Sequence, residues 1–554
     1  MPDSSRAPTF TEQFLPKIFT VLREGYGLRE LRDDAIAGLT VAIVALPLSM
    51  AIAIASGVGP ERGLYTAIVG GFLVSLLSGS RFQVGGPAGA FIVLVSACVT
   101  ATGIDGLMLA TFLSGILLMI TGALRLGTYI RFIPYPVTVG FTTGIAVIIF
   151  ASQIKDLLGL SVDGQEPGEI IAKVETLWAA RETLTPAAVG VAFVTIATIV
   201  GMKKFRPQWP GMLIAVIATG LAVALLDLPV QTIGTKFGEL PRVLPAPALP
   251  VINAETLMAA LPWALTFTLL GAIESLLSAV VADGMTGRQH RSNAELIGQG
   301  VANMGSAVFG GFCVTGTIAR TATNVRAGSR GPVSGMLHAL FILAFMLVAA
   351  PLAAYIPLAA LAGVLAVVAW NMAEKEELWA LIRSSRGDAM VVIVTLLLVV
   401  FRDLTEGIIV GFALGGLVFI RRMSDATVVR RSPETEGRYD PTAASDKNMV
   451  VYHLSGPFFF GAAAQLGSVL DRIADHPRAF VVDFSDVPFI DSSGARSFEL
   501  LGRKCHRQGG QLFLVGTNSE LRRVLLAAGV REPHVRYLPD VAGVRDVLRA
   551  TPPA

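Results

Sequence analysis

The chain has 554 residues, of which 53% are hydrophobic and only 15% are charged, and its net charge is +3. A soluble globular protein carries about 25% charged residues, so this composition and a mean hydropathy of +0.64 predict a polytopic membrane protein with some soluble mass attached. The small net charge gives no case for nucleic-acid binding. Three scattered cysteines argue against a disulfide framework and against a cysteine metal site.

Residues 1–32 are predicted to form a short cytoplasmic lead without a cleavable signal. About fourteen apolar segments follow, and a full membrane crossing takes about 20 apolar residues. The segments are expected at 36–57, 64–79, 86–100, 104–124, 137–157, 185–202, 210–228, 257–282, 294–311, 316–326, 332–356, 358–373, 387–402 and 405–422. The third and the tenth begin at glycine and are short, so we predict that both are half-helices.

The Lys and Arg residues near the ends of these segments favour an orientation with the N-terminus inside. The long segment 158–184 is then external. An even number of crossings also places the C-terminal region in the cytoplasm, and we expect the protein in the inner membrane of the cell.

The order of long helix, connecting segment and glycine-broken half-helix occurs twice, seven segments apart. The first break is GGPAGA at 85–90, and the second contains TGT at 315–317. An odd number of segments between two copies inverts the second copy in the bilayer, as in secondary transporters built from inverted repeats. The alternative is that Gly and Pro are simply common in membrane helices.

The composition changes after Met423. Residues 424–447 are predicted as a polar linker, and residues 448–554 as a small α/β domain in which strands alternate with helices. Strands are expected at 449–456, 479–487 and 511–516, and helices at 461–475, at 519–529 and near 540–549.

Glu274 is an acid inside an apolar segment, and Ser278 follows one helical turn later on the same face. An ionisable residue at membrane depth is interpreted by default as part of an ion or substrate path. Such a carboxyl group could change its protonation during a transport cycle. The alternative is a structural acid in a polar pocket between helices.

Thr315, Gly316 and Thr317 open the tenth segment, and Arg320 follows them. Free backbone N–H groups and the helix dipole at such a start favour an anion. Arg320 either attracts that anion or pairs structurally with an acid. Pro87 suits the first turn of the matching half-helix.

Four other residues receive weaker assignments. Pro47 is expected to kink the first segment. Asp33 and Asp34 are predicted to be N-terminal caps, and His290 is predicted to be a solvated loop histidine. The phosphate-binding loop and the common hydrolase motifs are absent from the sequence, so we expect no enzyme, no cofactor and no metal.

Four sequence stretches resemble a known family. PERGLYTAIVGGFLVSLLSGSR (60–81) resembles the signature of the sulfate-permease (SulP) family, solute carrier family 26. The stretches GAIESLLSAVVADGMTGRQHRSNAELIGQGVAN and TGTIARTATNVRAG resemble its eighth to tenth spans, and DFSDVPFIDSSGA resembles the STAS domain. Within the family, GAIESLL, DGMTG, NVRAG and the segment at 367–372 are similar to bacterial proton-linked C4-dicarboxylate transporters.

The resemblance implies a 7+7 inverted-repeat transporter at 33–423 with core and gate domains, a homodimer, and an elevator-like movement. It places the substrate site between the third and tenth spans, facing the first and eighth. The residues that it carries over to this site are Leu48, Ile52, Pro87, Ala88, Gly89, Glu274, Ser278, Ala319 and Arg320. Glu274 and Ser278 are assigned to proton coupling, and the others, with the residues at 315–317, to the substrate.

Two departures from the family bear on coupling and on the anion. Sodium-using bicarbonate members have Asp at the position of Glu274 and Thr at the positions of Ser278 and Ile318, so the oxygen cage for sodium is weakened here and a proton is favoured. Animal members have Gln at the position of Leu48, so the anion here would rely more on backbone groups.

In STAS relatives that are anti-sigma antagonists, a serine in the DSSG turn is phosphorylated, which makes Ser492 a candidate regulatory site and the domain a candidate contact for a cytoplasmic regulator. The alternative is that Asp491 and Ser492 merely cap the next helix.

The sequence therefore predicts proton-coupled uptake of a dianion, sulfate or a C4-dicarboxylate such as succinate or fumarate. The alternatives are a bicarbonate or other anion exchanger, a sodium symporter, and a channel-like anion conductor.

Overall fold

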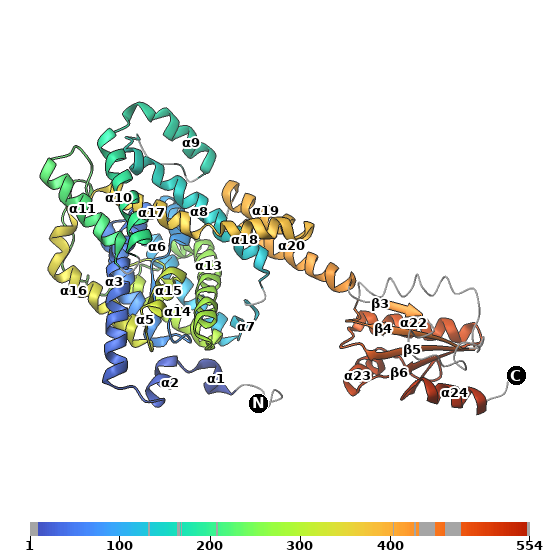
Figure 1. The fold of residues 1–554 in the computed structure, drawn as a ribbon. Coiled ribbons are helices and arrows are strands. Elements are labelled where there is room, and N and C mark those ends of the chain that lie inside the picture. Colours follow the sequence, from blue (N-terminus) through green and yellow to red (C-terminus); the bar gives the residue numbers. More distant parts are fainter. Residues whose placement is uncertain are drawn as a thin grey trace. The chain divides into compact units, whose positions relative to one another are not determined.

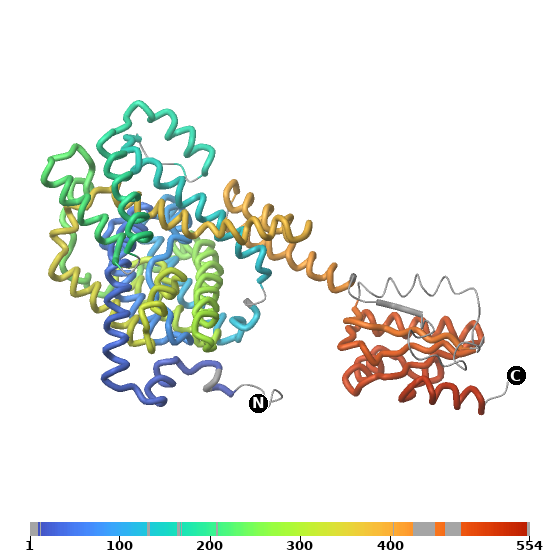
Figure 2. The backbone as a smooth tube through the Cα atoms, viewed as in Figure 1, coloured from blue at the N-terminus to red at the C-terminus, as the bar shows by residue number. Residues whose placement is uncertain are grey.

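A computed structural model describes residues 9–130, 133–162, 167, 169–206, 209–402, 404–425, 428–431, 449–459 and 478–550. The chain divides into two compact units, Met1–Phe412 and Ala413–Ala554. The first unit is built of helices, and the second contains a sheet (Figure 1). Figure 2 follows the same course as a backbone tube.

The predicted spans correspond to helices of the described chain. They are α3 (Leu28–Ala55), α4 (Pro60–Tyr65) joined through the π-helical turn η1 (Thr66–Gly70) to α5 (Gly71–Leu77), α6 (Ile92–Ala123), α8 (Tyr135–Leu158), α10 (Pro186–Phe205), α11 (Gly211–Leu226), α13 (Ala254–Thr286), α14 (Ser292–Val308), α15 (Ile318–Arg326), α16 (Val333–Ala353), α17 (Leu358–Met372), α19 (Arg386–Phe401) and α20 (Leu404–Asp425). Within the described residues, eight helical segments are long and apolar enough to cross a membrane.

Several local features differ from the prediction. The third and fourth spans run on as α6, which is interrupted only at Gly103, where φ is 72°. The structure adds the helices α1 (Phe10–Phe14), α2 (Lys17–Arg23), α7 (Gly127–Ile130), α9 (Ile170–Ala179), α12 (Ile233–Phe237) and α18 (Lys375–Ser384). These helices are too short or too polar for a search based on apolar length to find them.

The prediction that Asp33 and Asp34 cap the first span is wrong. Helix α3 begins at Leu28 after Gly27, so both acids lie inside the helix. Asp34 is fully buried, and its carboxylate accepts hydrogen bonds from the Tyr26 hydroxyl at 2.6 Å and from the backbone N–H of Gly331 at 3.1 Å. It therefore fastens the chain that precedes α16 to the start of α3.

The helix contacts follow the predicted twofold pattern. Helix α3, the first span, packs against α16, the eleventh, while α6, which contains the fourth, packs against α13, the eighth. Exchanging the first seven spans with the second seven converts one of these pairs into the other. The same exchange turns the contact between α8 and α19 into the contact between α10 and α17. The contacts α5·α14 and α8·α17 each join a span to its own counterpart, so the exchange leaves them unchanged. This is the arrangement expected of two structural repeats.

The same contacts define two helix groups in the first unit. The first group contains α3, α5, α6, α13, α14, α15 and α16, and the second contains α8, α10, α11, α17 and α19. They meet where α3 contacts α11 and α17, and where α8 contacts the start of α6. The two half-helices belong to the first group.

Within the first group, α6 and α14 cross with backbone against backbone. A Cβ atom on Gly115 would lie 2.6 Å from the carbonyl oxygen of Gly300, and a Cβ atom on Gly300 would lie 2.5 Å from the carbonyl oxygen of Gly115. Small residues permit such close approach where packing, and not a hydrophobic driving force, holds membrane helices together.

The second unit contains a five-stranded sheet in the order β3 (Val428–Arg431), β4 (Met449–Ser455), β5 (Ala479–Asp486), β6 (Gln511–Val515) and β7 (Val535–Leu538). Strand β3 is antiparallel to β4, and the remaining pairs are parallel. Helices α22 (Ser492–Arg507) and α23 (Ser519–Ala527) cover one face, where Phe498 and Leu525 are buried, and α24 (Val541–Ala550) covers the other through Val544.

The α/β prediction for this unit is confirmed, with two additions. Strand β3 lies within 424–447, which was predicted as linker, and β7 was not predicted. The helix predicted at 461–475 lies outside the described residues.

The glycine crossing generates the first prediction. Gly300→Ala should destabilise the protein by about 1–3 kcal/mol, because the new methyl group overlaps the carbonyl of Gly115 and neither backbone can yield alone. Gly284→Ala in α13 is the matched control, since a Cβ atom there meets nothing within 4 Å. The unfolding temperature of the purified protein measures both. Equal unfolding temperatures for the two variants would contradict the proposed packing.

Candidate functional site

A short backbone ladder joins the two glycine-broken segments. Strand β1 (Gly85–Gly86) pairs antiparallel with β2 (Thr315–Gly316), so that Gly85 lies opposite Gly316 and Gly86 opposite Thr315. A Cβ atom on Gly86 would lie 1.6 Å from Arg320 Nη1, and one on Gly316 would lie 1.7 Å from Gln83 Nε2. Glycine is required at both positions because a buried polar side chain occupies the space of its missing Cβ.

The ladder sets two helix N-termini side by side. One begins with the 3₁₀ turn η2 (Gly89–Phe91) that leads into α6, and the other begins α15. Ala88 and Thr317 precede these turns, and neither provides a side-chain cap. The first N–H groups of a helix have no partner within the helix and carry its positive dipole end. Two such ends therefore point into one region.

Arg320 lies next to this region and is 2% exposed. Its Nη2 donates to Ser49 Oγ at 3.1 Å and to the Pro87 carbonyl at 3.3 Å, and its Nη1 donates to the Gly85 carbonyl at 3.4 Å. Its Nε has no partner in the structure. Within the described part of the chain, no carboxylate forms an ion pair with Arg320, so its positive charge adds to the two dipole ends.

Helix α13 turns one face toward α15 and β2. The Gly271 carbonyl accepts a long hydrogen bond of 3.4 Å from Thr315 Oγ1, and Ser278 Oγ lies 3.1 Å from Thr321 Oγ1. Glu274 lies on this face between Gly271 and Ser278, at helical spacings of three and four residues. It is 7% exposed, and among the described residues its carboxylate receives no hydrogen bond. An acid without a partner thus keeps contact with accessible space beside the half-helices.

The other predicted residues surround the same region. Leu48 and Ile52 are buried on α3, which packs against α15. Pro87 and Ala88 are buried in the first break, whereas Ala319 at the start of α15 is exposed. The structure therefore brings the predicted residues together around the two helix starts.

Gly89 marks the boundary with the second helix group. A Cβ atom at Gly89 would lie 3.0 Å from Ile149 Cδ1 of α8 and 3.7 Å from Met372 Sδ of α17. The half-helix that begins there belongs to the first group. One edge of the candidate site is thus formed by side chains of the second group.

Sequence reasoning missed a buried network behind the ladder. Gln83 Nε2 donates to Ser275 Oγ at 2.9 Å and to Glu295 Oε1 at 2.8 Å, and Glu295 Oε2 accepts from the Ser80 N–H at 2.9 Å. Glu295 is fully buried in α14. The sequence contained a signal for this network, because Glu295, like Glu274, is an acid in an apolar segment. The hydrogen bonds of Glu295, which the sequence does not show, distinguish it from Glu274.

Helix α14 also supports β2 directly. Asn303 Nδ2 donates to the Val314 carbonyl at 3.0 Å, and the Val314 N–H donates back to Asn303 Oδ1 at 3.1 Å. Gln299 donates to the same carbonyl. These side chains replace the hydrogen bonds that a continuous helix would give this backbone.

The two histidines of this unit need separate comment. The prediction that His290 is solvated is wrong, since its Nδ1 lies 2.7 Å from Asp283 Oδ2 and its Nε2 lies 3.0 Å from Ser292 Oγ. His338 in α16 was not singled out, although it is fully buried and neither ring nitrogen has a hydrogen-bond partner in the structure. A lone histidine in an apolar segment was the available signal.

In the second unit, Asp491 caps α22, and its Oδ1 accepts from the Gly494 N–H at 2.6 Å. Ser492 is the first residue of this helix and is exposed. The capping alternative is therefore realised by Asp491, while the hydroxyl-bearing Ser492 remains accessible.

Comparison with known proteins decides the family. The sulfate permease family matches residues 31–395, and the STAS domain matches residues 440–536. The chain belongs to the sulfate permease family. It is thus a multi-pass anion transporter with a C-terminal STAS domain.

Two relatives of this family member are similar over most of their length. The putative sulfate transporter YvdB of Bacillus subtilis is 39% identical over 518 residues, which cover 92% of this chain and 95% of that protein. The bicarbonate transporter BicA of Picosynechococcus is 31% identical over 519 residues, which cover 90% of each. Both are named as transporters, which agrees with the expectation that this family member is not an enzyme.

A solved structure shares the fold. The structure of the murine Slc26a9 anion transporter aligns with a TM-score of 0.85 at 18% identity, covering 99% of this chain and 96% of that one. This likeness confirms the predicted fold, and the match at residues 440–536 identifies the C-terminal part as a STAS domain.

The contacts of Arg320 generate the second prediction. Arg320→Ala should raise the KM of the transported anion by about tenfold or more, because it removes a positive charge that no carboxylate neutralises and a donor to two backbone carbonyls. Arg326→Ala, at the exposed end of the same helix, is the control. Uptake kinetics in proteoliposomes measure both variants. An unchanged KM in Arg320→Ala would assign Arg320 a purely structural role.

Proposed function

We propose that this sulfate permease takes up a dianion together with a proton, and that the region between the two half-helices is the substrate site. The dianion is sulfate or a C4-dicarboxylate such as succinate or fumarate. The observation that carries the proposal is the meeting of two uncapped helix N-termini beside Arg320, with the unpartnered Glu274 on the facing helix.

A count of charges supports a dianion. Each helix N-terminus is equivalent to roughly half a positive charge, and Arg320 adds one, so the site offers about two positive charges. An ionised Glu274 would reduce this to about one. Protonation of Glu274 would therefore favour entry of a dianion, and release of the dianion would favour loss of the proton. The two events are linked through electrostatics without any direct contact between the ions.

The same region favours a proton over sodium. A sodium ion needs several oxygen ligands, and Ile318, at the start of α15, offers only an apolar side chain. Ser278 is fully buried with its hydroxyl against Thr321. Glu274 then serves as the proton carrier, and Ser278 holds α13 against the half-helix.

The second candidate is a bicarbonate transporter, and the name of the Picosynechococcus relative favours it. A site with an ionised Glu274 would offer about one net positive charge, which suits bicarbonate. An exchanger or a channel-like conductor would need no proton carrier, and the position of Glu274 argues against both.

We further propose an elevator-like movement of the first helix group against the second. The boundary at Gly89, Ile149 and Met372 supports this, because the half-helices belong to one group and the facing side chains to the other. The proposal includes a homodimer in the inner membrane, with both termini in the cytoplasm as the Lys and Arg distribution favours.

The domain limits remain part of the proposal, with a lead at 1–32, a transport domain at 33–423, a linker at 424–447 and a STAS domain at 448–554. Ser492 is proposed as a regulatory phosphorylation site, since it is exposed at a helix N-terminus that would favour a phosphate.

Uptake into proteoliposomes under an inward proton gradient tests the function. Labelled succinate, fumarate, sulfate and bicarbonate are compared with and without an uncoupler. Uptake of a dianion that collapses with the uncoupler supports the proposal and shows which dianion is carried. Bicarbonate uptake that ignores the proton gradient would support the second candidate.

Glu274→Gln is the third prediction. The variant should lose proton-driven accumulation while keeping the unfolding temperature of the wild type, because an amide preserves the shape of the side chain but cannot carry the proton. Glu255→Gln, in the exposed first turn of the same helix, is the control. A pH dependence of uptake that is the same in Glu274→Gln and in the wild type would refute the coupling role.

A further inference from the structure

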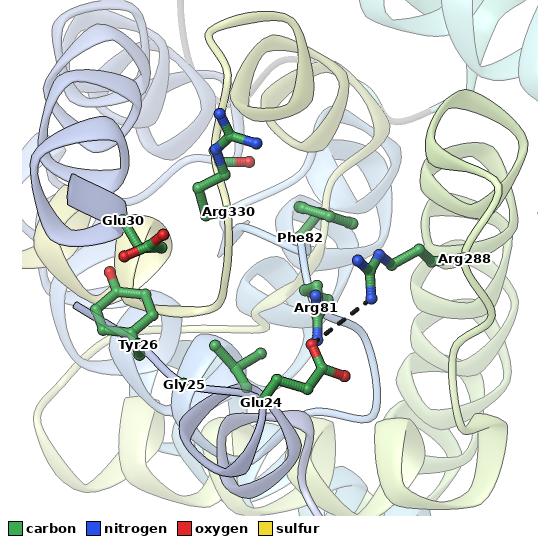
Figure 3. Close-up of a pocket in the computed structure, with 10 residues that line it drawn as sticks. Glu24, Gly25, Tyr26, Glu30, Arg81, Phe82, Arg288 and Arg330 are labelled. Carbon is green, nitrogen blue, oxygen red and sulfur yellow. Dashed lines mark hydrogen bonds and ion pairs between the residues drawn. The ribbon is translucent and has the colours of Figure 1, made fainter.

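A polar cavity lies at the ends of the helices, on the side of the N-terminus. Two adjoining hollows of about 210 and 250 Å³ share Glu24, Arg81, Phe82 and Arg288. Figure 3 shows Glu24, the residue after α2, reaching toward Arg81 and Arg288, which come from the chain after α5 and the chain after α13. The second hollow is also lined by Lys17, Asp283 and Gln289.

Helix α2 is fastened to this side of the first helix group. The Lys17 N–H donates to the Ser78 carbonyl at 3.0 Å. Arg291 Nη1 donates to the Leu15 carbonyl at 2.7 Å and to Thr20 Oγ1 at 3.1 Å. The cavity is therefore bordered by α2, by the chain after the second span (α5) and by the chain after the eighth span (α13).

The acids of the cavity do not balance its cations. Arg81 forms an ion pair with Glu24, and Arg288 reaches only 3.7 Å from the same carboxylate oxygen. Asp283 is occupied by His290. The Lys17 ammonium group has no hydrogen bond or ion pair among the described residues. Glu30 and Arg330 also line the first hollow, where Glu30 accepts from the backbone N–H of Gly27. Glu24 is thus the carboxylate that pairs with Arg81 and Arg288.

The pKa values of Lys17 and Glu24 determine how much charge each side chain brings to the cavity. Burial, together with the nearby Arg291 and Arg81, lowers the pKa of Lys17 to about 8, against the opposing effect of Asp283 and Glu24. The hydrogen bond from Arg81 holds the pKa of Glu24 below its usual range, so Glu24 is ionised at neutral pH.

We propose that this cavity binds a multivalent oxyanion of the sulfate or phosphate type between Lys17, Arg81 and Arg288. This site is separate from the region between the half-helices and does not depend on which ion is transported there. Arg288 and Lys17 have donors to spare, while Glu24 competes with the anion for the same cations. A bound oxyanion would join α2 to the chain segments after α5 and α13.

Thermal unfolding of the full-length protein in nanodiscs tests the site, with sodium sulfate and inorganic phosphate as probes. Both anions should raise the unfolding temperature in a saturable way. Lys17→Gln and Arg288→Gln should each raise the half-saturating concentration about tenfold, since each removes one charge-assisted contact. Glu24→Gln should lower it, because the competing charge is gone while the shape is kept.

Matched controls separate this site from other effects. Arg23→Gln changes an exposed cation on the same helix outside the cavity and should leave the half-saturating concentration unchanged. Lys17→Arg keeps the charge and should keep the response, even if Lys17→Gln folds poorly. The unfolding temperature without added anion shows whether each variant is folded.

The lipid composition of the nanodiscs distinguishes a dissolved oxyanion from a lipid headgroup. In nanodiscs of phosphatidylcholine alone, stabilisation by dissolved sulfate or phosphate indicates a free anion. Stabilisation that instead requires phosphatidylglycerol, and is lost in Lys17→Gln, indicates a lipid headgroup. Stabilisation that is equal in wild type, Lys17→Gln, Arg288→Gln and Glu24→Gln overturns the proposal, because the anion then binds elsewhere. Absence of any stabilisation also overturns it.

The lowered pKa of Lys17 gives a further prediction. Anion binding favours the charged ammonium, so the affinity should fall as the pH rises through about 8, and at pH 9 only about a tenth of the lysine is charged. The charged groups that face Lys17 are Arg81, Arg288, Arg291, Glu24 and Asp283. Titrations with sulfate, which stays a dianion over this range, should differ between pH 7 and pH 9 in the wild type and agree in Lys17→Gln. A pH dependence that survives in Lys17→Gln would contradict this role of Lys17.

Discussion

The structure depends on one constraint, which is that backbone polar groups inside a membrane must find partners within the protein. The chain breaks two helices at 85–88 and at 310–317, where no water would compensate the loss. The hydrogen bonds between β1 and β2 give some backbone groups of each break a partner in the other break. Asn303 and Gln299 of α14 supply further partners to Val314. Each repeat therefore lacks a stable half-helix until the other repeat is in place.

The same two breaks also create the candidate anion site. A continuous helix has no free N–H groups in its middle, whereas these two helices begin inside the protein and leave theirs uncapped. Arg320 is held by backbone carbonyls and by Ser49, and not by a carboxylate within the described chain, so its charge stays available. The buried acid Glu295 is consumed by structural hydrogen bonds, while Glu274 is not. Two glutamates on the consecutive helices α13 and α14 thus differ in whether the structure supplies them with hydrogen-bond donors.

Apolar length and glycine breaks were enough to predict the spans, the two half-helices and the repeat, because these features follow from the thickness of the bilayer and from backbone geometry. Partners could not be predicted in the same way. Glu274 and Glu295 look alike in sequence, and only the fold shows that Gln83 reaches one of them. Asp34 looked like a cap because its partner, the chain at 330–331, is nearly three hundred residues away. The strand β3 was hidden in a polar stretch that lacks a hydrophobic pattern.

The reciprocal contact of Gly115 and Gly300 has a consequence for movement. Two helices whose backbones touch cannot slide along each other by even one residue without overlap, unlike helices separated by flexible side chains. Since α6 comes from one repeat and α14 from the other, this contact holds the two repeats together, so that their helices in the first group would move as one rigid unit. The distance between two spin labels placed on α6 and α14 would therefore stay the same in every state of the transporter. It would serve as the reference distance for measuring a displacement of α8 or α17.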